Sequence, residues 1–169
     1  MGLSSSTAEE LEHTRSSRET VLTLVAGLSC MDALIHLGAA VDHAGQFPLY
    51  AATFALLAAM QIAWAALILW RPGERVLLYG CAFNAGILAL WALSRTVGVP
   101  VAPRPWVPEP VGVADLIASV AELVVILAVW SIVMAPRLRI ARYLSERAVL
   151  PIVALLFFAS LYGVGAHAG

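Results

Sequence analysis

Two histidines and two aspartates lie close together, between Asp32 and His43, in a segment whose other residues are mostly apolar. Helical residues four apart are separated by about 40° and residues seven apart by about 20°, so Asp32, His36 and His43 share one helical face. Asp42 lies about 100° away from that face. Imidazole and carboxylate groups are together the ligands that zinc, copper and iron accept in proteins. The pattern therefore indicates a transition-metal site.

A second pair of carboxylates, Asp115 and Glu122, is also seven residues apart and shares one helical face. Each of the two helices then carries one polar residue near its end and another about 10 Å deeper. If the helices pack side by side and antiparallel, His43 meets Asp115 in an outer pair. His36 meets Glu122 in a deeper pair, and Asp32 lies one turn below. These five residues are the predicted metal ligands.

Three further residues are candidates for counter-ions or for groups that hold the ligands in place: Asp42, Arg95 and His167. Arg95 ends a span on the same side as His43, where it could pair with Asp42 or Asp115. His167 is the histidine that could face His36 or His43 from another span. Haem bound by two histidines takes one from each of two facing helices. Because only His167 could supply the second histidine, haem is not expected.

The same residues fit two other interpretations. Carboxylate–imidazole pairs can pass protons through a membrane protein, and buried pairs can simply join one helix to another. A charged side chain in the middle of a membrane helix costs about 2.5–3.5 kcal/mol on insertion scales, so a set of them favours a functional role. Metal binding is the leading hypothesis, and the other two stay open.

The composition assigns the chain to the integral membrane proteins. Of its 169 residues, 61% are hydrophobic and 12% are charged, and the mean hydropathy is +0.87. A soluble domain contains about 25% charged residues, so this chain is expected to lie in a lipid bilayer. The net charge of -1 offers no basic surface for nucleic acid. The spacing of Cys30 and Cys81 matches no zinc or redox motif.

Five apolar stretches are long enough to cross a bilayer, which takes roughly 20 helical residues. We expect these spans at 20–43, 47–70, 76–97, 113–134 and 148–167, after a polar tail at 1–19 that is partly disordered or interfacial. The fold class is therefore all-α, with one membrane domain over 20–169 formed by a bundle of five transmembrane helices. Small residues in the first two spans permit close packing, or a seam between copies in a homo-oligomer.

Arginines set the expected orientation, because short cytoplasmic loops are enriched in Lys and Arg. They lie in the tail, at 71–75 and at 137–147, which fall on one side of a five-span bundle. The N-terminus is therefore expected in the cytoplasm and the C-terminus outside, in a bacterial inner (plasma) membrane. The outer loop at 98–112 is rich in proline, which restricts the backbone, so it is either a stiff lid or a plain spacer. Gln61 and Asn84 lie at similar depths, which predicts a hydrogen bond between them.

Two segments carry a resemblance: 36–50, "HLGAAVDHAGQFPLY", and 93–122, "LSRTVGVPVAPRPWVPEPVGVADLIASVAE". They resemble segments of small uncharacterised multi-pass bacterial membrane proteins. The resemblance implies the membrane class and carries no assigned activity. The spacing of Asp32, His36 and a later histidine is also similar to a copper-binding helix of particulate methane and ammonia monooxygenases, as an analogy of chemistry.

The predicted function is that of a membrane protein with a His/carboxylate site in its outer half. The site would bind a transition metal (Cu, Zn or Fe), for metal handling or as an accessory subunit of a larger membrane complex. One alternative is a metal-dependent membrane oxidoreductase acting on an apolar substrate, with His36, His43 and Glu122 as ligands. The other is a proton- or ion-conducting protein, for which the inner half offers only Gln61 and Asn84.

Overall fold

The computed structural model describes residues 5–134, and every regular element within them is an α-helix. The four helices are α1 (Ser5–His43), α2 (Pro48–Trp70), α3 (Glu74–Thr96) and α4 (Val113–Met134). All four are long and apolar enough to cross a bilayer. This part of the chain is therefore an all-α, membrane-type fold. The predicted fifth span at 148–167, with His167, and the arginine-rich segment before it lie outside the described residues.

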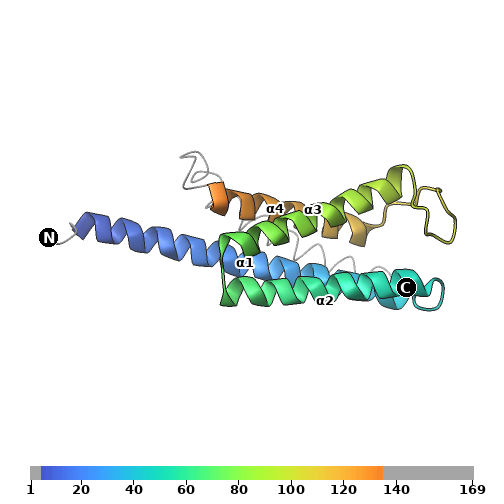
Figure 1. Ribbon diagram of the computed structural model, residues 1–169, viewed down its shortest axis with the longest axis horizontal. Helices are drawn as coiled ribbons and strands as arrows, with labels where there is room; N and C mark the ends of the chain where they lie inside the picture. The colour runs from blue at the N-terminus through green and yellow to red at the C-terminus, as the bar shows by residue number, and fades with distance from the viewer. Residues whose placement is uncertain (1–4, 135–169) are drawn as a thin grey trace.

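Helix α1 begins much earlier than the sequence analysis expects. Residues 5–19, assigned above to a polar tail, are helical and continuous with the first span, so that α1 is 39 residues long. Glutamate, leucine and arginine in this segment are good helix formers, and Arg15 Nε lies 3.0 Å from Glu19 Oε1 one turn along. Figure 1 shows the first part of α1 projecting beyond the other three helices.

The other three helices begin and end within two residues of the predicted bounds. Pro48 occupies the first turn of α2, where the amide proton that it lacks has no helical partner. Gly73 precedes α3 in an extended conformation. Gly98 has a φ of +81°, and a Cβ at this position would lie 2.6 Å from the backbone nitrogen of Val107. Glycine is therefore required where the chain leaves α3 and enters the Pro-rich loop.

The helices form two antiparallel hairpins, α1–α2 and α3–α4. Helix α1 packs most extensively on α2 and also contacts α4, whereas α2 and α3 touch least. Figure 1 shows the two hairpins side by side, with the α1–α2 turn and the α3–α4 loop at the same end. We call the half of the bundle next to these two connections the open half. The half next to the short α2–α3 connection is the closed half.

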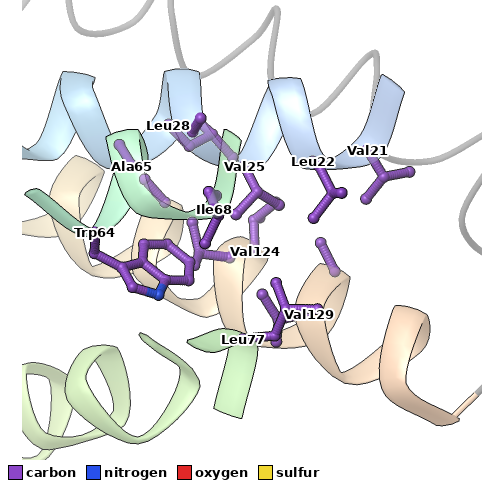
Figure 2. Packing of buried hydrophobic residues seen from close by; sticks show 14 of the residues in the cluster. Val21, Leu22, Val25, Leu28, Trp64, Ala65, Ile68, Leu77, Val124 and Val129 are labelled. Carbon is purple, nitrogen blue, oxygen red and sulfur yellow. The ribbon is translucent and has the colours of Figure 1, made fainter. Parts of the chain in front are cut away.

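The closed half contains an apolar core to which all four helices contribute. Val25, Ile68, Leu77 and Val129 are each 1% exposed or less. Figure 2 shows these side chains converging from the four helices. Because lipid tails are as apolar as these residues, the core is held by close van der Waals packing more than by exclusion from water.

Trp64 closes the gap between α2 and α3 in this half. Its Nε1 donates a hydrogen bond to the carbonyl of Val76 at 2.9 Å. Its ring occupies the space beside Gly80, where a Cβ would lie only 1.9 Å from the indole. The contact between these two helices therefore depends on one large residue packed against one residue without a side chain.

A layer of buried polar side chains lies at the boundary between the two halves. Ser29, Asp32, Gln61 and Asn84 are all fully buried. Ser29 Oγ donates to the Gln61 carbonyl at 3.1 Å, and Asn84 Nδ2 donates to the Gly80 carbonyl at 2.8 Å. The predicted hydrogen bond between Gln61 and Asn84 is not formed, and both atoms of the Gln61 amide lack a partner among the described residues. The reason is that α2 and α3 touch least, and Asn84 bonds within its own helix.

Candidate functional site

His36 and Glu122 face each other across the contact between α1 and α4. His36 Nε2 lies 3.6 Å from Glu122 Oε1, and the two side chains are 8% and 1% exposed. This is the deeper of the two pairs that the sequence predicts. The separation is longer than a hydrogen bond. It is close to the roughly 3.4 Å that separates two ligands bound at about 2.1 Å to one tetrahedral metal ion.

Asp32 lies one helical turn from His36 and is fully buried. Its carboxyl lies on the same face of α1 as His36, one turn deeper in the bundle. Both Asp32 oxygens, His36 Nε2 and Glu122 Oε1 have no hydrogen-bond partner in the part of the chain that the structure describes. Buried polar atoms in proteins are almost always hydrogen-bonded. These four atoms, without a hydrogen-bond partner among the described residues, therefore could bind a further group.

We call Asp32, His36 and Glu122 the buried cluster, and its charges do not balance. It contains two acids and one base, so that one negative charge remains even if both acids are ionised and His36 is protonated. A buried charge without a partner costs several kcal/mol. Arg95 does not supply the missing positive charge, because it is paired with other carboxylates. The cluster therefore needs a proton on a carboxyl group or a bound cation.

The predicted outer pair of His43 with Asp115 is not formed. Asp115 Oδ2 instead accepts hydrogen bonds from Arg95 Nη2 at 2.6 Å and from the Gly112 backbone amide at 3.1 Å. A guanidinium is always charged and presents several donors to a carboxylate, which makes it a stronger partner than imidazole. Arg95 therefore has the counter-ion role considered above, toward Asp115.

His43 packs against α2 and not against α4. Its Nδ1 lies 2.8 Å from the carbonyl oxygen of Ala39 in its own helix. Its ring centroid is 5.6 Å from that of Tyr50 and 5.4 Å from that of Phe54. Asp42 is exposed at the end of α1. Neither His43 nor Asp42 belongs to the buried cluster.

The Pro-rich loop at 98–112 is attached to the helix ends through Glu109. The Glu109 carboxylate accepts hydrogen bonds from Arg95 Nη1 at 2.5 Å and from the Tyr50 hydroxyl at 2.8 Å. Its backbone amide donates to the Ser94 carbonyl at 3.0 Å. These contacts join the loop to α2 and α3, and residues 99–101 line the cavity described next. The loop is therefore fixed to the ends of α2 and α3, and whether it acts as a lid or as a spacer stays open.

A cavity of about 1620 Å³ lies between the two hairpins. It follows α1 from Thr23 to His43, and most of its lining is apolar. Aromatic rings of α2 and α3 also line it, including those of Phe54 and Trp91. His36 and Glu122 lie in its wall, so the buried cluster is reached from the cavity.

No group of three or more His, Cys, Asp or Glu side chains within residues 5–134 has the arrangement of a metal site. His36 and Glu122 supply two donors close together, and Asp32 is the next one along α1. His43 and Asp115, the other two predicted ligands, bond elsewhere. Of the five predicted ligands, the structure therefore brings only His36 and Glu122 together.

Two residues that the sequence analysis did not single out contribute to this region. Trp91 lies one turn from Arg95 on α3, and its Nε1 is buried without a partner among the described residues. The spacing of four residues from Arg95 could have placed it on the same helical face. Tyr50 gave no such signal, because its bond to Glu109 depends on how α2 packs against the loop.

Comparisons of the chain with protein-family models, with curated proteins and with solved structures found no match. The resemblance noted from the sequence therefore stays a prediction. The site is interpreted below from the chemistry and placement of its own residues.

Proposed function

We propose that this membrane protein binds a transition-metal ion at the buried cluster. The proposal rests on four buried atoms of Asp32, His36 and Glu122 that could bind a metal and that have no hydrogen-bond partner among the described residues. The acids among these residues outnumber the bases. A divalent cation would balance the two carboxylates and bind those atoms. One imidazole nitrogen with carboxylate oxygens suits Zn, Cu or Fe.

The proposed role is metal handling, or service as an accessory subunit, in a homo-oligomer or a larger membrane complex. A metal-dependent oxidoreductase acting on an apolar substrate is the second candidate. The cavity favours it, because His36 and Glu122 lie in the wall of an apolar space large enough for a substrate. A metal held by three side chains would keep a coordination position for that substrate.

Conduction of protons or ions has less support. A conducting path would have to pass through the closed half, where side chains such as Val25, Ile68 and Val129 are packed without exposure. Buried polar groups between the helices reach only as far as Ser29 and Gln61. A proton bound at the cluster would therefore enter and leave through the open half.

Elemental analysis of the purified protein tests the proposal. We expect about one equivalent of Zn, Cu or Fe per chain, lost in His36→Ala and in Glu122→Gln. His43→Ala is the matched control and should keep the metal, because His43 bonds to its own helix. A wild-type protein without stoichiometric metal after loading would overturn the proposal, and a visible absorption spectrum of the same sample tests for haem.

The proposed topology has five spans in a bacterial plasma membrane, with the N-terminus in the cytoplasm and the C-terminus outside. Its support is the set of arginines at the closed-half end: Arg15, Arg18, Arg71 and Arg75. Arg18 Nη2 donates to the Pro72 carbonyl at 2.8 Å, which brings the first helix and the α2–α3 connection together. The open half would then face outward.

Labelling of single cysteines in intact cells tests this topology. In a chain carrying Cys30→Ala and Cys81→Ala, a membrane-impermeant maleimide should label Arg104→Cys in the Pro-rich loop and leave Arg71→Cys unlabelled. The reverse pattern would invert the orientation.

A further inference from the structure

The cavity contains more unpartnered hydrogen-bonding groups than the proposed metal site uses. Trp91 Nε1 and Arg95 Nε are buried N–H groups without an acceptor in residues 5–134, and both residues line the cavity. His36 Nε2 and Glu122 Oε1 are unpartnered in the same wall. Buried polar atoms are normally bonded. A ligand with hydrogen-bonding groups at two places would satisfy both sets.

The helix positions give the spacing between these two sets. Trp91 lies about 6 Å deeper than Arg95 along α3, and Glu122 lies about 10 Å deeper than Asp115 along α4. Arg95 and Asp115 are in direct contact, at 2.6 Å. Trp91 therefore lies about 4–5 Å above Glu122 along the bundle. Trp91 and the His36–Glu122 pair therefore lie at similar depths, and they are separated mainly across the cavity, because α3 and α1 do not contact each other.

The facing side of the cavity is aromatic. The rings of His36 and Phe54 are stacked, with centroids 5.8 Å apart and an interplanar angle of 22°. His43 packs against Phe54 and Tyr50 above them. Such rings present flat faces to which a planar ring binds by offset stacking. The ligand would therefore be flat as well as polar at two edges.

The cavity also has room for a long apolar chain. It continues along α1 past Met31 and Gly27 to Thr23, about 20 Å from His36. This part is an open groove lined mainly by aliphatic side chains and glycine, in which Thr23, Gly27 and Leu34 are exposed. A volume of about 1620 Å³ exceeds what a single ring needs.

We propose that the cavity binds a quinone or hydroquinone with a hydrocarbon tail. One ring oxygen accepts a hydrogen bond from Trp91 Nε1, and the oxygen at the opposite edge bonds at His36 and Glu122. The tail lies along α1 toward Thr23. The proposal supplies a substrate class for the second candidate function, yet it rests on the cavity and its unpartnered groups and not on a bound metal.

Isothermal titration calorimetry with decylubiquinone tests the proposal on the full chain in detergent, with EDTA present. We expect saturable binding of one ligand per chain. Removing one hydrogen bond in Trp91→Phe, or the acid in Glu122→Gln, should weaken binding about ten-fold. Trp130→Phe is the matched control for the first change, because Trp130 is exposed and is not among the residues that line the cavity. It should bind as the wild type does.

Decylbenzene has the same tail and a ring without oxygens, and it should bind at least ten-fold more weakly. Equal affinity for the two molecules would overturn the proposal and define an apolar lipid site. Absence of saturable binding would also overturn it, and would leave the cavity to lipid or to residues beyond 134. If Trp91→Phe does not fold, as judged by circular dichroism, the Glu122→Gln result decides. Because His36 and Glu122 serve both proposals, EDTA keeps metal from occupying them during the titration, and metal content is measured on a separate sample, so that failure of one proposal is distinguished from failure of the other.

Discussion

The closed half and the open half of the bundle are built by the same four helices and differ in what fills the space between them. In the closed half, aliphatic side chains from every helix meet around Ile68 and Leu77, and Trp64 fills the gap beside Gly80. In the open half, the space between the hairpins is a cavity, which continues as a groove along α1 past the closed-half core to Thr23. Within residues 5–134, side chains therefore fill the closed half and leave a cavity in the open half.

The polar groups follow the same division. The closed-half core has no charged side chain among its described members. The open half contains the buried cluster and, above it, Arg95 bonded to Glu109 and Asp115. The contrast predicts that the closed half contributes most of the stability, while the open half, within residues 5–134, keeps polar atoms without hydrogen bonds and space not filled by side chains. Four predictions test this contrast, from the largest expected effect to the smallest.

Truncating a side chain should cost far more in the closed half than in the open half. Ile68→Ala removes a fully buried side chain from the core and should lower the free energy of unfolding by about 2–4 kcal/mol. Leu57→Ala, on the same helix, should cost less than about 1 kcal/mol, because Leu57 borders the cavity and has fewer contacts to lose. SDS titration in mixed micelles, followed by circular dichroism, measures both. Equal losses would mean that the cavity wall is packed as tightly as the core.

Adding one methyl group should be harmful only where the helices approach closely. Gly80→Ala places a Cβ within 1.9 Å of the Trp64 ring and should destabilise the protein by about 1–3 kcal/mol. Gly86→Ala, also on α3, meets no atom within 4 Å and should be neutral or stabilising by up to about 1 kcal/mol. Thermal unfolding of the two variants in one detergent compares them. A tolerated Gly80→Ala would show that Trp64 can move, contrary to a tightly packed closed half.

The attachment of the Pro-rich loop should weaken when Arg95 is removed. Arg95→Gln leaves Glu109 and Asp115 without their cation and should cost about 1–2 kcal/mol, because both carboxylates keep some access to water. Limited proteolysis should then cleave the loop at 98–112 faster. Arg104→Gln, an exposed loop residue, is the control and should leave the cleavage rate unchanged. If both variants are cleaved at the wild-type rate, Glu109 and the loop are held by other contacts.

The smallest effect is expected at the boundary layer. Gln61→Met replaces an amide whose nitrogen and oxygen have no partner among the described residues with an apolar side chain of similar length. Such a change should be neutral or stabilising, within about 1 kcal/mol, because no hydrogen bond is lost. The same SDS titration measures it. A clear loss of stability would mean that the Gln61 amide has a partner beyond residues 5–134 or in ordered water.

The helices and one part of the site could be predicted because they depend on local geometry. Apolar runs of sufficient length placed α2, α3 and α4 within two residues, since crossing a bilayer requires a nearly constant helix length. The facing of His36 and Glu122 followed from equal spacing on two helices, because the helical rise and rotation per residue are fixed. The start of α1 was not predicted, since a polar segment can continue a helix when its residues favour helix formation.

The rest of the site depends on which helices touch, and by how much. Asp115 lies at the depth along α4 at which His43 could meet it. Its carboxylate is bound instead by Arg95, which comes from the neighbouring helix α3. The Gln61 and Asn84 amides have matching depths but lie on the two sequential helices that touch least. The cavity also reflects the limited contact between α2 and α3. The sequence by itself determined the membrane class, the helices and the faces on which their polar residues lie, because these follow from chain-local periodicity. Only the tertiary structure decided which faces meet and where space remains, because packing depends on contacts between residues far apart in the chain.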